Sequence, residues 1–190
     1  MAVTLNLQPA LKLTPGQFAE LAQINQDLQL ELTATGALII MPPTGGETGN
    51  KNFEIYIDLG LWNRETRLGK AFDSSTGFRL PNGAVRSPDV SWLKLERWQA
   101  LTPEQRKKFL PLCPDFAVEL VSETDEIQTT RSKMQEYLTN GLRLGWLIDP
   151  ETKTVEIYRQ NRQVEVLHSP ATLSGEEVLP DFILTLQPIW

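Results

Sequence analysis

The pattern of apolar and polar positions begins with an amphipathic helix and a short strand. Residues 14–17, Thr-Pro-Gly-Gln, combine an N-cap residue, a proline at the first helical position and a capping-box glutamine. A helix is therefore expected from Pro15. The apolar run Ala37 to Met41 predicts a strand that stops at two prolines. From about Asn50, apolar residues recur at helical spacing and predict a second helix.

The middle of the chain predicts short strands joined by turns. Ala71-Phe72 and Gly77 to Leu80 flank the turn sequence Asp-Ser-Ser-Thr at 73–76, which predicts a hairpin. Asp89 to Leu93 follows a proline and predicts another strand. Residues 102–105 repeat the capped helix start, and this helix is expected to run to Phe109 or Leu110.

The last third of the chain predicts a βαβ unit followed by a hairpin. Phe116 to Val121 and Leu144 to Ile148 are apolar runs that flank a helix expected over Thr129 to Asn140, with Gly141 as its C-terminal cap. Val155 to Tyr158 and a second strand over 164–167 predict the hairpin. Together the elements predict an α/β (α+β) fold, with a mixed central sheet flanked by helices and extra hairpins.

Length and composition favour one ordinary globular domain. The 190 residues, 41% of them hydrophobic, suit a single domain over 1–190, in which 1–36 is expected to be an N-terminal helical extension. The apolar runs are too short to cross a bilayer, and no secretory signal is visible at the N-terminus. One cysteine, Cys113, excludes a disulfide framework within the chain. We therefore expect a cytoplasmic protein without a membrane partner.

The net charge of −6 argues against a protein that coats nucleic acid by charge alone. It does not exclude a nuclease, because carboxylates that hold a divalent metal ion make an active site acidic. Two local basic patches, one at Arg64, Arg67 and Lys70 and one over Arg106 to Lys108, could contact phosphate, although each is more typical of a solvated face.

Glu119 interrupts the most apolar strand of the chain. Both faces of the strand Phe116 to Val121 are otherwise apolar, which is typical of a central strand covered on both sides. An isolated buried charge is costly, so Glu119 must be protonated, paired with a cation or bound to a metal ion. A structural ion pair and a metal site are equally consistent with this pattern.

Two further residues could join Glu119. Asp89 begins the preceding predicted strand, and two carboxylates on neighbouring strands can share Mg²⁺, which prefers oxygen ligands. Lys133 borders the inward stripe of the following helix, so its ammonium could reach an acid. It could also extend to solvent, which is the commoner arrangement for such a lysine.

Five segments of the chain, taken in order, form a distinctive set. They are PPTGGETGNKN (42–52), RSPDVSWL (86–93), PDFAVELVSETD (114–125), RSKMQEYLTNGLRLGWLIDP (131–150) and SGEEVLPDFILTL (174–186). With this set, the chain resembles a large bacterial family of restriction-endonuclease-like proteins within the PD-(D/E)XK nuclease superfamily, and the resemblance covers nearly the whole chain.

This resemblance implies a DNA endonuclease that hydrolyses phosphodiester bonds with Mg²⁺ or Mn²⁺. It assigns the metal-binding acid pair to Asp89 and Glu119, completes an E-x-x-S signature with Ser122, and matches Glu47 to an acidic position that could supply an auxiliary ligand. The superfamily's usual lysine, two residues after the glutamate, is replaced by a valine here. The resemblance assigns its role to Lys133 on the next helix, whose ammonium would position or activate the attacking water.

Two other functions remain open on the sequence alone. The acidic balance and the replaced lysine also fit a nuclease-fold protein that binds or assembles without cutting. A metal-dependent hydrolase of another phosphate ester is the third reading. A homodimer is compatible with this type of fold, although no heptad or apolar patch in the sequence indicates one.

Overall fold

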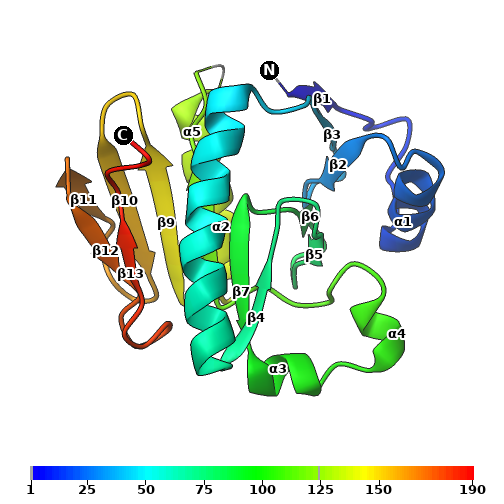
Figure 1. Ribbon diagram of the computed structural model, residues 1–190. Coiled ribbons are helices and arrows are strands. Elements are labelled where there is room, and N and C mark those ends of the chain that lie inside the picture. Colours follow the sequence, from blue (N-terminus) through cyan, green and yellow to red (C-terminus); the bar gives the residue numbers. More distant parts are fainter. Residues whose placement is uncertain (1, 124) are drawn as a thin grey trace.

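Figure 1 shows the computed structural model, which describes residues 2–123 and 125–190. The helices are α1 (Pro15–Ile24), α2 (Gly46–Thr66), α3 (Leu95–Gln99), α4 (Pro103–Arg106) and α5 (Ile127–Thr139). The strands are β1 (Val3–Leu5), β2 (Gln29–Leu32), β3 (Leu38–Met41), β4 (Gly69–Phe72), β5 (Phe78–Arg79), β6 (Val85–Arg86), β7 (Val90–Lys94), β8 (Phe116–Leu120), β9 (Leu144–Asp149), β10 (Thr154–Arg159), β11 (Glu165–His168), β12 (Thr172–Ser174) and β13 (Ile183–Thr185).

In the described part of the chain, the strands form one large sheet and two smaller ones. The large sheet, here the central sheet, has six strands in the order β11-β10-β9-β8-β7-β4. Its β8 and β9 are parallel, and its other neighbouring strands are antiparallel. A five-stranded sheet, the N-terminal sheet, has the order β1-β3-β2-β6-β5, and β12 pairs with β13.

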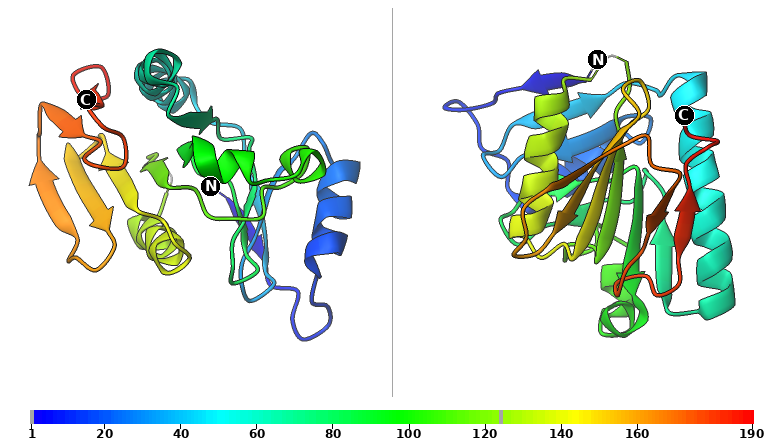
Figure 2. Two further views of the ribbon diagram at one scale, coloured as in Figure 1. Left: turned by 90° about the horizontal axis from the view of Figure 1, so that it is seen from below. Right: turned by 90° about the vertical axis from the view of Figure 1, so that its left-hand side faces the viewer.

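Helices α2 and α5 cover opposite faces of the central sheet (Figure 2). On one face, Ile55 and Leu59 of α2 belong to the same buried cluster as Val118 of β8. On the other face, Met134 of α5 packs in a cluster with Ala117 of β8. Burial of each large apolar side chain stabilises the fold by about 1.5–3 kcal/mol. The two faces of β8 are therefore both shielded from solvent, as the sequence pattern predicts.

The N-terminal sheet lies beside the central sheet and carries α1. Phe18 of α1 is fully buried against Leu30 and Leu32 of β2. The first 36 residues, expected as a helical extension, contain the strands β1 and β2 in addition to α1. Because β2 pairs with β3 and with β6, this segment is built into a sheet that continues further along the chain.

Several predicted elements are confirmed by the structure. Helix α1 begins at Pro15 with the expected capping box. The βαβ unit is present, with Phe116 of β8 opposite Leu144 of the parallel β9. Gly141 has a φ of +108°, in the left-handed region that a glycine adopts without strain. The predicted C-terminal hairpin corresponds to β10 and β11.

Three predictions about local structure are wrong in detail. The segments around the turn at 73–76 do not form a hairpin, because β4 pairs with β7 in the central sheet and β5 pairs with β6 in the N-terminal sheet. Helix α4 ends at Arg106, short of Phe109, because Leu110 bridges to Phe78. Helix α2 begins at Gly46, four residues before the expected start.

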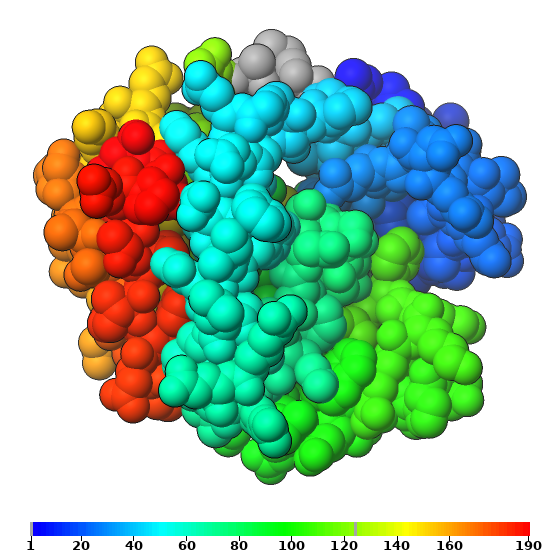
Figure 3. All heavy atoms as spheres, viewed as in Figure 1, coloured from blue at the N-terminus to red at the C-terminus, as the bar shows by residue number. Residues whose placement is uncertain are grey.

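One face of the molecule is formed by α2 and the C-terminal segment. Figure 3 shows α2 running along one face, with the C-terminal segment beside it. Within residues 2–123 and 125–190, no helix has both the length and the apolar content that crossing a bilayer requires.

Candidate active site

The two carboxylates predicted as a pair lie opposite each other on neighbouring strands. Val90 of β7 pairs with Val118 of the antiparallel β8, so the register places Asp89 opposite Glu119. Both side chains lie toward α5, on the face that Ala117 shares. The Asp89 carboxylate reaches the end of β8, where its Oδ2 accepts a hydrogen bond from the backbone N–H of Leu120 at 2.8 Å.

Lys133 points inward from α5 and contacts two glutamates. Its Nζ lies 3.0 Å from Oε1 of Glu119 and 2.9 Å from Oε1 of Glu31. One turn further along the helix, the hydroxyl of Tyr137 donates to the same Oε1 of Glu119 at 3.0 Å. The Lys133 side chain is only 12% exposed. The alternative in which this lysine extends to solvent is therefore excluded.

Glu31 is a member of this cluster that the sequence did not indicate. It lies on β2, and its side chain is 3% exposed. Besides Lys133, it accepts from the backbone N–H of Ser87 at 2.9 Å and from Nη1 of Arg86 at 3.1 Å. The turn at Gly36, whose φ is +89°, followed by an apolar run is a signal that could have revealed β2 as the first strand of a hairpin.

Arg86 supplies the second cation of the cluster. Its Nε donates to Oε2 of Glu136 on α5 at 2.6 Å, and Asn82 donates to the other oxygen of Glu136 at 3.0 Å. The cluster therefore holds four carboxylates, those of Glu31, Asp89, Glu119 and Glu136, and two cations. With all groups ionised, it would carry two negative charges in excess.

Burial and charge shift the pKa values of the two opposed carboxylates upward. For Glu119, burial is the largest cause, and the neighbouring acids Asp89 and Glu31 add to it, so that its pKa rises to about 8 even though Lys133 opposes the shift. Burial also raises the pKa of Asp89, against the stabilising backbone N–H of Leu120. The positive charge that the protein places near these two carboxylates is therefore too small to offset their burial and mutual repulsion.

The pKa values of Glu31 and Lys133 shift in the directions that keep both groups charged. Burial acts to raise the pKa of Glu31, but the charges of Lys133 and Arg86 outweigh it and lower that pKa. Burial acts to lower the pKa of Lys133, but the Glu119 and Glu31 carboxylates outweigh it and raise that pKa. Lys133 is therefore an ammonium group at neutral pH, able to donate hydrogen bonds but not to accept a proton.

Asp89 is also fixed through its backbone. The hydroxyl of Tyr56, on α2, donates to the carbonyl oxygen of Asp89 and accepts from the backbone N–H of Ser74 at 2.8 Å. A single side chain of α2 thus connects the start of β7 to the loop after β4. This connection holds the Asp89 backbone from the face of the sheet opposite α5.

The structure does not bring Glu47 into the cluster. Glu47 is exposed in the first turn of α2, and among the described residues none forms a hydrogen bond or ion pair with its side chain. Figure 1 draws the start of α2 at the same end of the molecule as the start of α5. Ser122, the last residue of the E-x-x-S signature, donates from its backbone N–H and its hydroxyl to Asp125 at 2.9 and 2.7 Å.

The donor set at Asp89 and Glu119 fits a hard divalent ion. Both offer only oxygen atoms, and one oxygen of Asp89 accepts no hydrogen bond from any described residue. Mg²⁺ is commonly held by one or two carboxylates while it keeps several waters. Across residues 2–123 and 125–190, no group of three or more His, Cys, Asp or Glu side chains is arranged to hold a metal ion.

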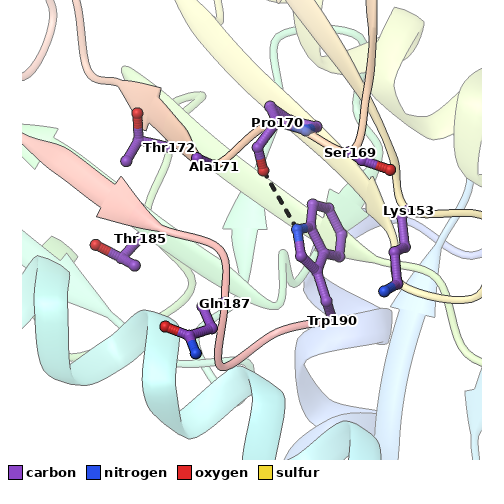
Figure 4. Close-up of a pocket in the computed structure, with 8 residues that line it drawn as sticks. All are labelled: Lys153, Ser169, Pro170, Ala171, Thr172, Thr185, Gln187 and Trp190. Carbon is purple, nitrogen blue, oxygen red and sulfur yellow. Dashed lines mark hydrogen bonds between the residues drawn. The ribbon is translucent and has the colours of Figure 1, made fainter.

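One pocket on the surface lies away from this cluster and has different chemistry. Figure 4 shows it beside β12, β13 and the C-terminal Trp190, whose Nε1 donates to the carbonyl oxygen of Pro170 at 3.2 Å. Its lining contains no carboxylate side chain; the lining residues are Lys153, Ser169, Pro170, Ala171, Thr172, Thr185, Gln187 and Trp190. This pocket therefore offers no metal ligands of the kind that Asp89 and Glu119 provide.

Comparison with solved structures identifies the architecture. The chain matches a crystal structure described as a "putative nuclease" from Anabaena variabilis ATCC 29413, with a TM-score of 0.78 and 20% sequence identity, over 93% of this chain and 97% of the other. At this identity the likeness shows a shared fold. The curated proteins include no match.

Comparison with family models extends this result to the sequence. Residues 15–187 match the model of the Uma2 family, which is described as "Putative restriction endonuclease". The matched range includes every residue of the acidic cluster and both helices that cover the central sheet. The chain has the restriction-endonuclease-like fold and belongs to the Uma2 family of nuclease-type proteins.

Proposed function

We propose that this protein is a metal-dependent DNA endonuclease that hydrolyses phosphodiester bonds, with Asp89 and Glu119 as the ligands of Mg²⁺ or Mn²⁺. Family membership supports a nuclease in general terms. One observation carries the finer proposal: Asp89, Glu119 and Lys133, from three separate segments of the chain, meet in one buried cluster.

The charge balance of the cluster supports a cation at this position. Asp89 and Glu119 both have raised pKa values, because they are buried among further acids with too little compensating charge. A divalent ion would remove that deficit. When bound, such an ion would stabilise charge on a phosphate group and supply a water of lowered pKa.

Lys133 would act on the substrate as a hydrogen-bond donor. Its ammonium group has three N–H bonds. Two are directed at Glu31 and Glu119 at 2.9–3.1 Å, and the third meets the carbonyl oxygen of Ser87 at the longer distance of 3.4 Å. This third N–H is the least strongly held, so it can turn toward a phosphate oxygen and stabilise the negative charge that develops there.

Tyr137 would keep Glu119 in place during the reaction. Its hydroxyl donates to Glu119, and burial, together with the charge of Glu119, raises the pKa of the phenol well above its usual value. The Tyr137 hydroxyl group therefore stays protonated at neutral pH and can donate its hydrogen bond to Glu119. Glu47 stays a predicted auxiliary ligand, although it is exposed at the start of α2 and lies outside the cluster.

Plasmid cleavage with matched variants tests the proposal. Purified protein should nick or cut plasmid DNA in MgCl₂ or MnCl₂ and not in EDTA. Glu119→Gln should lower the rate by about 100- to 1,000-fold, the range expected when one group that stabilises the transition state is lost. The control is Glu156→Gln, which removes a buried glutamate of the same sheet that contacts neither Asp89 nor Lys133.

Two results would count against the proposal. Equal cleavage by the two variants would show that Glu119 is not a metal ligand. If the wild-type protein neither cuts DNA nor binds Mg²⁺ or Mn²⁺ in a calorimetric titration, the chain is instead a nuclease-fold module that binds or assembles without cutting.

A further inference from the structure

We infer that Glu31, on the N-terminal sheet, is a positioning residue that holds the Lys133 ammonium in its active geometry. The inference rests on the proposed function and adds a residue that neither the sequence pattern nor the family resemblance assigned. Glu31 touches Lys133 and lies outside the Asp89–Glu119 pair, so it would act through the lysine.

The position of Glu31 is determined by strand pairing. Leu32 of β2 pairs with Val85 of β6, so the antiparallel register places Glu31 directly opposite Arg86. Opposite charges at facing positions of a strand pair attract each other. The 3.1 Å contact between Arg86 and Glu31 is therefore fixed by the same register that forms the sheet.

The contacts close into a ring that returns to α5. Lys133 binds Glu31 at 2.9 Å, Glu31 binds Arg86 at 3.1 Å, and Arg86 binds Glu136 at 2.6 Å. Glu136 follows Lys133 by three residues, so both lie on the same side of α5. The side of α5 that carries the lysine is thus attached to the N-terminal sheet at two points.

Glu31 itself cannot move freely within this ring. Its Oε1 accepts from the backbone N–H of Ser87 at 2.9 Å as well as from Lys133, and its Oε2 accepts from Arg86. Both oxygens are therefore fixed by groups of β6 and the residue that follows it. Without Glu31, the Lys133 ammonium would keep only Glu119 as its carboxylate partner, and it would move toward that side.

Through Glu31, the N-terminal sheet would help to position the ammonium group that acts in the reaction. A lysine held by Glu119 alone would lie against the carboxylate that is proposed to bind the metal ion. The second carboxylate holds the ammonium midway between the two acids, where its third N–H can reach a phosphate oxygen. Misplacement of a reacting group by about 1 Å can cost about 100-fold in rate.

Cleavage kinetics of three single variants test the inference. Glu31→Gln keeps the size of the side chain and removes its charge, so kcat should fall by about 100-fold while KM for DNA changes less than threefold. Glu156→Gln is the matched control, because it removes the charge of a buried glutamate that contacts neither Glu31 nor Lys133, and its kcat should stay within about threefold of the wild type. The third variant, Lys133→Met, is measured alone and in combination with Glu31→Gln.

The decisive comparison is non-additive. If Glu31 acts through Lys133, Glu31→Gln should have no further effect on the rate of Lys133→Met. Additive losses, or a Glu31→Gln enzyme as fast as the wild type, would overturn the inference while leaving the proposed nuclease intact. Thermal melts of all variants distinguish loss of folding from misplacement of the Lys133 ammonium group. A wild-type protein that does not cut DNA would instead refute the proposed function.

Discussion

Two buried glutamates occupy the same row of the central sheet and differ in their surroundings. Glu119 of β8 and Glu156 of β10 both pair with Leu147 of the intervening β9, and both lie on the face covered by α5. Each contacts one cationic side chain of α5 and accepts a hydrogen bond from one tyrosine hydroxyl group. For Glu156 these are the guanidinium group of Arg131 and the hydroxyl group of Tyr158, which donate hydrogen bonds to its carboxylate oxygens at 2.5–2.8 Å.

The difference lies in the number of acids around each pair. Glu156 has one cation to itself, and the Arg131 side chain is 41% exposed. Glu119 shares Lys133 with Glu31 and also faces Asp89, and its pKa rises to about 8. A buried carboxylate with its own cation is thus a structural ion pair, whereas the surplus of buried acid around Glu119 supports the metal site proposed there.

Removal of the partner cation should distinguish the two glutamates most strongly. Lys133→Met leaves Glu31 and Glu119 buried without their shared cation, and we expect the free energy of unfolding to fall by about 3–5 kcal/mol. Arg131→Met should cost about 1 kcal/mol or less, because its ion pair is accessible to solvent. Urea denaturation of both variants measures the difference.

The pH dependence of this loss has a defined sign. The folded-state pKa of Glu119 is above its ordinary value, so the folded protein binds more protons and becomes less stable as pH rises toward that pKa. Without Lys133 the pKa of Glu119 should rise further. The loss of unfolding free energy in Lys133→Met should therefore be larger at pH 9 than at pH 6. Equal losses for Lys133→Met and Arg131→Met at every pH would remove the distinction between the two glutamates.

A divalent ion should produce the next largest difference. Mg²⁺ at ten times its dissociation constant should stabilise the wild-type protein by about 1.4 kcal/mol, because it binds the folded state. Thermal melts with and without MgCl₂ should show this gain for the wild type and for Glu156→Gln. Asp89→Asn should lose it, since one of the two proposed ligands is absent. A gain that survives in Asp89→Asn would locate the ion elsewhere.

The sequence predicted much of the fold because the central elements have strong local patterns. The strand around Glu119 is apolar on both faces, and the helix before Gly141 has a clear inward stripe and cap. The alternation along β8 places Glu119 on the same face as Ala117, which packs against α5. The hairpin predicted at 73–76 failed because turn residues fix the local bend and not the partner strand.

Glu31 could not be predicted by the same reasoning. The pattern of β2, in which Glu31 lies between Leu30 and Leu32, places the glutamate on the polar side of a strand. What buries it is the pairing of β2 with β6 and the approach of α5, which bring Arg86 and Lys133 to that side. These contacts join residues 55 or more positions apart, and no local pattern encodes them.

The two tyrosines provide the smallest and most closely matched comparison. Tyr137→Phe removes one donor from Glu119, and Tyr158→Phe removes one donor from Glu156. Each change should lower the free energy of unfolding by about 1 kcal/mol, the typical net contribution of one hydrogen bond. Only Tyr137→Phe should alter the dissociation constant for Mn²⁺ in a calorimetric titration, because only Glu119 is a proposed ligand. If Tyr158→Phe changed that constant equally, the surplus of acid around Glu119 would not be what distinguishes the two glutamates.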